Sequence, residues 1–167
     1  QATAQLFGYD VGVSVDNGGN SYNKLLPNTD GSKNEHSRIW GKPIYAIADG
    51  IVRHFRNDFP ENAAPSKERS AEIKALINQV GDGNGNFLTV ETGNETVLYA
   101  HMQQGSVNPA LLSAGAHVTR GMFLGLAGNP GNSSAPHLHI HANRSNTGSQ
   151  SWDDAPRPLT FSDVRTV

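Results

Sequence analysis

Three histidines occupy alternate positions late in the chain, at His137, His139 and His141. Residues two apart on a β-strand point to the same face and lie roughly 7 Å from one another. Imidazoles on one face allow one ring to bind a metal ion while its neighbour takes a proton from water beside that ion. The triplet therefore predicts a metal site with an adjacent base. The alternative is a sheet face filled with satisfied, partly buried histidines.

Composition narrows the possible chemistry and partners. The chain has no cysteine, which excludes disulfide bonds, a thiolate zinc site and a cysteine nucleophile. Its net charge of −2 supplies no basic field for nucleic acid or for an anionic membrane. No apolar run approaches the roughly 20 residues that a membrane-spanning helix needs. We therefore predict that neither nucleic acid nor a membrane is a partner.

Short β-strands are predicted to position the histidines. The 167 residues include 18 glycines and 9 prolines, a balance typical of strands joined by tight turns. This length suits one domain, residues 1–167. The predicted fold class is all-β, a single domain of antiparallel sheets. The predicted strands are 6–15, 43–48 and 51–55 as a hairpin around Asp49-Gly50, 87–91 and 96–101 as a second hairpin, 118–128, and 137–141.

One helical insertion, at about residues 65–80, interrupts the predicted strands. Ser66 is predicted to cap it and Gly81 to end it. Residues 16–36 form a long polar loop, and we expect this loop and residues 57–81 to lie at the periphery rather than in the core. The apolar stripe of the helix consists of Ile73, Leu76, Ile77 and Val80.

Several blocks of the sequence, in the same order, resemble the lysostaphin-type zinc metalloendopeptidase family. The most specific is the Pro136-His137-Leu138-His139 strand after a loop of Gly, Asn and Ser, preceded by the strand end Tyr99-Ala100-His101. The other blocks are residues 43–52 and 121–125. The combination is specific, although no single block is.

The resemblance implies a zinc ion in a groove on a β-sheet. An early His and Asp and the second His of the His-x-His pair would hold the ion, which makes Asp10 and His139 the metal ligands here. His137 would be the base, and His101 would be its partner, either as a second base or as a donor to the developing oxyanion. The resemblance also implies a secreted or periplasmic monomer whose partner is a peptidoglycan peptide or a related cell-wall polymer.

The early motif departs from the family pattern at one ligand. Leu6-Phe7-Gly8-Tyr9-Asp10 is similar to His-x-Gly-x-Asp, with Leu6 in place of the histidine, and a spacing used in part of the family selects Ala4 instead. Neither side chain has a lone pair to donate, so zinc is expected to bind weakly or not at all. Three explanations stay open: natural loss, recruitment of an outside ligand such as His36, or engineered replacement at Ala4 or Leu6.

Two functions follow from this incomplete ligand set. The first is a zinc metallopeptidase-like domain resembling peptidoglycan endopeptidases, inactive as it stands. The second is a non-catalytic module that binds a cell-wall peptide, a glycan or a protein partner. Among the other histidines, His141 is a reserve candidate for the groove, whereas His54 and His117 are predicted to be solvated or structural.

Overall fold

A computed structural model describes residues 6–19, 21–144 and 156–160 of the chain. This part is mostly β-strand in antiparallel sheets with one α-helix, which confirms the predicted fold class. No helix in it is both long and apolar enough to cross a membrane. The strands are β1 (Tyr9–Val11), β2 (Val15–Asp16), β3 (Tyr22–Asn23), β4 (Pro43–Tyr45), β5 (Gly50–Arg56), β6 (Asn86–Thr92), β7 (Glu95–Met102), β8 (His117–Val118), β9 (Phe123–Leu126), β10 (Leu138–Arg144) and β11 (Pro156–Arg157).

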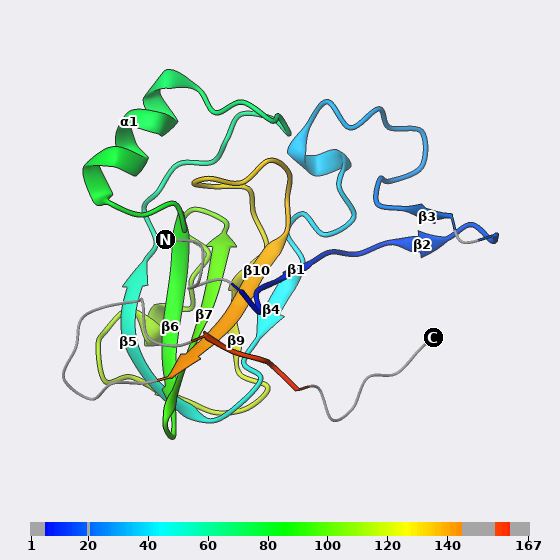
Figure 1. Ribbon diagram of the computed structural model, residues 1–167. Coiled ribbons are helices and arrows are strands. Elements are labelled where there is room, and N and C mark those ends of the chain that lie inside the picture. The colour runs from blue at the N-terminus through cyan, green and yellow to red at the C-terminus, as the bar shows by residue number, and fades with distance from the viewer. Residues whose placement is uncertain (1–5, 20, 145–155, 161–167) are drawn as a thin grey trace.

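The main sheet places the late histidine strand between two segments that lie far from it in sequence. Its order is β1-β10-β7-β6-β5-β8, with β11 also pairing with β10 (Figure 1). All of its pairs are antiparallel, and two short sheets, β2-β3 and β4-β9, accompany it. β10 thus carries its side chains between those of the early strand β1 and those of β7.

The second predicted hairpin is confirmed, and the first is wrong. β6 and β7 pair around a turn at Gly93, as their turn residues indicate. The runs at 43–48 and 51–55 do not pair with each other, because β4 pairs with β9 and β5 pairs with β6 and β8. The Asp49 carboxylate instead accepts a hydrogen bond of 2.7 Å from the Arg120 backbone N–H. Pairing partners distant in sequence therefore overrode a local turn signal.

The strand predicted for residues 6–15 is also shorter than expected. Only Tyr9–Val11 and Val15–Asp16 are strands, and the segment that joins them is exposed. Three paired residues suffice to hold the segment on the edge of the main sheet, with Asp10 opposite His139. The register of this short strand is what matters for the site.

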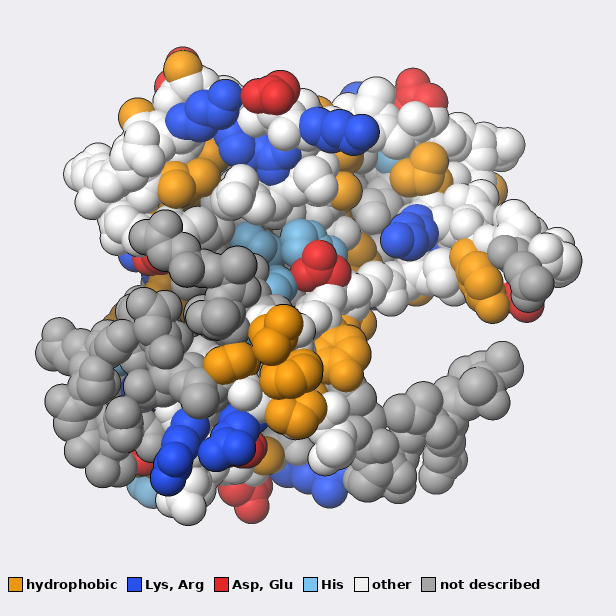
Figure 2. All heavy atoms as spheres, viewed as in Figure 1, with side chains coloured by type: hydrophobic (Ala, Val, Ile, Leu, Met, Phe, Trp, Pro, Cys, Tyr) orange, Lys and Arg blue, Asp and Glu red, His pale blue; other side chains and the backbone are white. Residues whose placement is uncertain are grey.

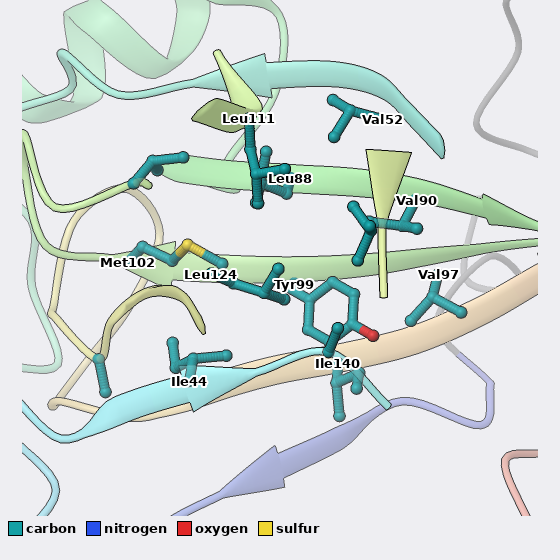
Figure 3. Close-up of a cluster of buried hydrophobic side chains, with 14 of the residues drawn as sticks. Ile44, Val52, Leu88, Val90, Val97, Tyr99, Met102, Leu111, Leu124 and Ile140 are labelled. Carbon is teal, nitrogen blue, oxygen red and sulfur yellow. The ribbon is translucent and has the colours of Figure 1, made fainter. Parts of the chain in front are cut away.

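The core lies on one face of the main sheet, and alternation decides which side chains enter it (Figure 3). From β7 and β10, Tyr99 and Ile140 point into this core, where Tyr99 is 1% exposed. Burial raises the pKa of Tyr99 to about 12, and its hydroxyl accepts a hydrogen bond of 3.1 Å from the Ile47 N–H. The residues between them, including Ala100 and His139, must face the opposite side of the sheet.

The helix α1 (Ala71–Val80) begins later than predicted. Ser70, not Ser66, caps it by accepting a hydrogen bond of 3.2 Å from the Ile73 N–H, and Gly81 ends it in the left-handed conformation as expected. Residues 57–81 are less peripheral than predicted, because Phe59 and Asn62 within them are buried. Asn62 proves important for the site.

Candidate metal centre

Sheet register brings Asp10 and His139 together. Asp10 on β1 and Ala100 on β7 lie directly opposite His139 on β10, so these three side chains form one row across the outer face. The Asp10 Oδ1 and His139 Nδ1 atoms are 2.8 Å apart although 129 residues separate them. The small Ala100 side chain is fully buried in this row. The pattern of strands thus explains why the early carboxylate meets the late imidazole.

His137 reaches the same carboxylate from the loop before β10. Its Nδ1 lies 2.8 Å from the Ala135 carbonyl oxygen, which can only accept a hydrogen bond, so Nδ1 carries the proton. Ser133 Oγ lies 3.1 Å from the same nitrogen. In a neutral imidazole the lone pair is then on Nε2, which is 3.4 Å from Asp10 Oδ1. His137 therefore presents a basic nitrogen to the site.

His101 enters the site through a β-bulge. Strict alternation would send its side chain into the core with Tyr99, two residues earlier. The β6-β7 register shifts here, since Phe87 pairs with Ala100 but Asn86 pairs with Met102, and His101 has a φ of 62°. This extra residue turns the ring to the outer face, where its centroid lies 4.7 Å from that of His137. A strained backbone conformation thus places His101, the predicted partner of His137, in the site.

Burial fixes the state of His101. The ring is 7% exposed, and burial lowers the pKa of His101 to about 3, so the imidazole is neutral near pH 7. Its Nδ1 lies 2.9 Å from the Pro130 carbonyl oxygen and must carry the proton, which leaves Nε2 with a lone pair. In this tautomer Nε2 cannot donate to an oxyanion, and the low pKa makes the ring an acceptor of a hydrogen bond rather than of a proton near pH 7.

His141 contacts His139 directly. Its Nδ1 lies 2.9 Å from His139 Nε2, on the far side of the ring from Asp10. Burial, with the charge of His139, lowers the pKa of His141 to about 4, so this ring is neutral. Without a metal, the His139 Nδ1–H donates to Asp10 Oδ1. With a metal bound, His139 would instead donate its Nε2–H to His141 Nδ1 and present the Nδ1 lone pair to the ion. Such second partners orient the ligating imidazole.

Three donor groups can share one metal ion. The ligand atoms of Asp10, His137 and His139 all lie within 4.8 Å of one another. A zinc ion with ligands at about 2.0 to 2.2 Å requires donors up to about 4 Å apart, so a small adjustment suffices. Burial raises the pKa of the Asp10 carboxyl, but the hydrogen bond from His139 and the surrounding imidazoles outweigh it and leave that pKa below its ordinary value. A carboxylate with two imidazoles is a donor set that suits zinc.

The other candidate ligand positions, and the two remaining histidines, lie outside this donor group or outside the described residues. Leu6 is described and 64% exposed, whereas Ala4 lies outside the described residues. His36 Nδ1 lies 3.0 Å from Asp30 Oδ1, and His36 does not belong to the group that can hold a metal, so the structure gives no support to its recruitment. His54 and His117 are exposed and also outside the group.

His141 should tune metal binding through the ring of His139. We expect His141→Leu to weaken zinc affinity by about ten- to a hundredfold, because the His139 Nε2–H loses its acceptor. His141→Gln keeps an acceptor oxygen and should recover most of that loss. Zinc competition with a chromophoric chelator measures both variants, with the exposed His117→Gln as control. Equal affinity for His141→Leu and the unchanged chain would assign His141 a structural role only.

A buried asparagine holds the loop that carries His137, and sequence reasoning missed it. The Asn62 amide nitrogen lies 2.6 Å from the Asn129 carbonyl oxygen, 3.0 Å from that of Gly131 and 3.2 Å from that of Ser133. Asn34 in turn donates to the Asn62 backbone carbonyl over 2.7 Å. Nothing in the local pattern around Asn62 predicts these contacts, which span about seventy residues of chain.

Gly131 permits the close approach of this loop to the 81–86 turn. It has a φ of 73°, and a Cβ there would clash with the Gly83 carbonyl oxygen and the Gly85 nitrogen. We expect Gly131→Ala to lower the free energy of unfolding by about 3 kcal/mol. Gly121→Ala, at a φ of 81° with open space around it, should cost only about 1 kcal/mol. Urea denaturation of both variants separates the clash from the backbone strain, and equal losses would contradict the role of the clash.

A hollow opens beside the donor group. Figure 2 shows histidine side chains gathered at its floor, next to an acidic side chain. A cavity of about 350 Å³ is lined by Asp10 and His137 and by residues of the 16–36 loop. The loop residues are Lys24, Leu25, Gly31 and Lys33.

The chain was compared with curated proteins and with solved structures. No curated protein matches the chain significantly. Similar solved structures include an alanine-to-histidine variant of the catalytic domain of the prophage-encoded M23 protein EnpA from Enterococcus faecalis, with 18% identity, 71% of this chain and 68% of that chain covered, and a TM-score of 0.47. The catalytic domain of the antimicrobial peptidase lysostaphin from Staphylococcus simulans gives 21% identity, coverage of 74% and 77%, and a TM-score of 0.45. A zinc-containing peptidase from Vibrio cholerae gives 26% identity, coverage of 64% and 24%, and a TM-score of 0.41.

The family assignment comes from the sequence match to a family model. The model of peptidase family M23 matches residues 35–151, which include His101, His137 and His139. The match begins after Asp10, so the place of Asp10 in the site rests on the sheet register and on its contact with His139. The chain belongs to peptidase family M23 and is related to peptidoglycan endopeptidases.

Proposed function

We propose that this chain is a zinc-binding, peptidase-like domain that takes peptides of the bacterial cell wall outside the cytoplasm, and that it does not cleave them as it stands. The observation that carries the proposal is the single carboxylate oxygen of Asp10, which lies 2.8 Å from His139 Nδ1 and 3.4 Å from His137 Nε2. Membership of family M23 supports the peptidase-like part. The leucine at the early ligand position supports the loss of cleavage.

In this proposal each side chain has one task. Asp10 and His139 hold the metal, and His141 keeps the His139 ring in place through its Nε2–H. Zinc, when bound, supplies Lewis-acid activation of water and of a peptide carbonyl. His137 takes a proton from water at Nε2, and His101 accepts a second hydrogen bond at its own Nε2. The missing ligand would both weaken metal retention and leave the water poorly positioned.

His137 admits a second role, because the donor group includes it. As a third ligand it would replace the missing histidine, and the base would then have to be His101. The two roles predict different results for His137→Ala. If His137 is a base, zinc affinity stays within about twofold; if it is a ligand, zinc affinity falls on the order of a hundredfold. Chelator competition with the unchanged chain as reference decides between them.

The proposal is tested by zinc binding and cleavage measured together. We expect the unchanged chain to bind zinc weakly, His139→Ala and Asp10→Asn to bind none, and none of them to release fragments from cross-linked muropeptides analysed by chromatography. Cleavage by the unchanged chain that His139→Ala abolishes would show a complete site and overturn the proposed inactivity. If His139→Ala leaves zinc binding unchanged, the proposed metal site is wrong.

A non-catalytic binding module is the second candidate function, and the hollow beside the donors favours it. The cavity of about 350 Å³ stays available for a peptide whether or not zinc is held. Co-sedimentation with purified peptidoglycan tests this candidate. If both the unchanged chain and His139→Ala sediment with peptidoglycan, the result supports a binding module. If His139→Ala no longer sediments with it, peptide binding depends on the metal.

A further inference from the structure

Two lysines line the cavity beside the candidate metal centre. Lys24 and Lys33 both come from the 16–36 loop, and both side chains are exposed. Asp10 and His137 line the same cavity, so the two lysines and part of the donor group border one space. Figure 2 shows a basic side chain close to the hollow that holds the histidines. A ligand seated at the donors therefore extends toward two positive charges.

Neither lysine is neutralised by an acidic residue of the described chain. The ion pairs of the described residues involve other basic groups, and neither lysine is among the residues with further contacts. Asp10, the acidic group on the cavity wall, is already engaged by His139 and His137. Two ammonium groups without an acidic partner among the described residues, at a concave surface, attract an anionic group on a ligand.

The backbone that carries these lysines is fixed. The Lys24 carbonyl accepts a hydrogen bond of 2.9 Å from the Arg38 N–H, and Leu25 forms a β-bridge with Ser37. The Lys33 carbonyl accepts one of 3.1 Å from the His36 N–H at the start of the 3-10 helix η1 (Asn34–His36). These contacts hold the backbone of both lysines in place beside the cavity.

Several apolar side chains also line the cavity, together with Ser37 and Ser134. The apolar ones include Val13, Leu25, Ile39 and Pro136. They suit small aliphatic side chains such as alanine. The lining therefore combines a surface for short apolar groups with two cations.

We propose that this cavity is a subsite for a carboxylate of a short peptide, held by Lys24 and Lys33 while the neighbouring residue of the peptide lies at the donor group. The inference rests on the proposed function and names the class of peptide: one that carries a free carboxylate next to small aliphatic residues. A peptidoglycan stem tetrapeptide has alanine at its first and last positions, an isoglutamyl residue with a free α-carboxylate at the second, a diamino acid at the third, and a free terminal carboxylate. Both carboxylates have the required chemistry.

Four synthetic tetrapeptides distinguish the two carboxylates. They share the sequence L-Ala-γ-D-Glu-L-Lys-D-Ala and differ in whether the isoglutamyl α-carboxylate, the terminal carboxylate, both or neither is amidated. Binding to the unchanged chain, with zinc present, is measured by isothermal titration calorimetry. We expect amidation of one of the two carboxylates to weaken binding about tenfold, and that one identifies the group in the subsite.

The lysine variants test whether the wall causes this preference. Lys24→Gln and Lys33→Gln should each weaken binding of the peptide with both carboxylates free about three- to tenfold. Binding of the peptide with both carboxylates amidated should stay within about twofold. Lys74→Gln on α1, where Lys74 pairs with Glu68 on the exposed surface, is the matched control and should change neither. Circular dichroism of each variant confirms that the fold is kept.

The outcomes separate this inference from the proposed function. A preference for the carboxylate that survives in the double variant Lys24→Gln/Lys33→Gln overturns the role of the wall. If all four peptides bind equally, the inference of a carboxylate subsite is wrong, and the proposed function is unaffected. If no peptide binds at all, the proposed function as a cell-wall peptide module fails together with the subsite.

Discussion

Replacing Leu6 with histidine is expected to raise the zinc affinity of this chain on the order of a hundredfold or more, because a catalytic zinc normally has three protein ligands and an open position. Leu6 is exposed and outside the core, so the substitution should cost little stability. Ala4→His is the alternative repair, at the other spacing relative to Asp10. Chelator competition gives the zinc affinity, and muropeptide digestion shows whether cleavage appears with it.

The control for this repair is a histidine on the wrong face of the same strand. Val11 is adjacent to Asp10 on β1, so its side chain points away from the row that contains His139. Val11→His should therefore leave zinc affinity unchanged. A gain for Val11→His equal to that for Leu6→His would mean that any added histidine recruits zinc. If neither Leu6→His nor Ala4→His gains affinity, the groove is a binding surface and the enzyme interpretation should be dropped.

Asn62→Ala is expected to lower the free energy of unfolding by about 3 kcal/mol or more. The change removes the amide that joins the buried carbonyls of Asn129, Gly131 and Ser133. The Asn129 carbonyl keeps the Asn62 backbone N–H, whereas the other two lose this donor, and each orphaned carbonyl costs about 1 to 3 kcal/mol. Urea denaturation measures the loss. Asn94→Ala, in the exposed turn between β6 and β7, should change stability by less than about 0.5 kcal/mol.

The same variant should also weaken the site. The loop that Asn62 holds carries His137 and supplies the Pro130 carbonyl that fixes the His101 ring. In the Leu6→His background, where zinc is retained, Asn62→Ala should therefore reduce cleavage at temperatures at which the protein is still folded. A variant that loses stability but keeps full activity would show that the loop geometry is maintained without Asn62.

Much of the site followed from rules that act within a few residues. Alternation on a strand places His139 and His141 on one face, and the structure confirms it. The β6-β7 hairpin and the left-handed Gly81 at the end of α1 were predicted from their turn and cap residues. Several blocks, among them residues 136–139 and 99–101, together resembled the family that the family model then matched. Each of these signals has a fixed period or a fixed spacing along the chain.

Contacts between distant segments decided the rest. The hairpin expected at 43–55 does not form, because β4 and β5 find better partners elsewhere in the sheets. The ring of His101 reaches the site only through a bulge set by the pairing of β6 with β7. Asn62, Lys24 and Lys33 gain their roles from loops that meet across the fold. Sheet register and loop packing depend on which of many possible strand and loop pairings is most stable in the whole chain. No local pattern in the sequence determines that choice.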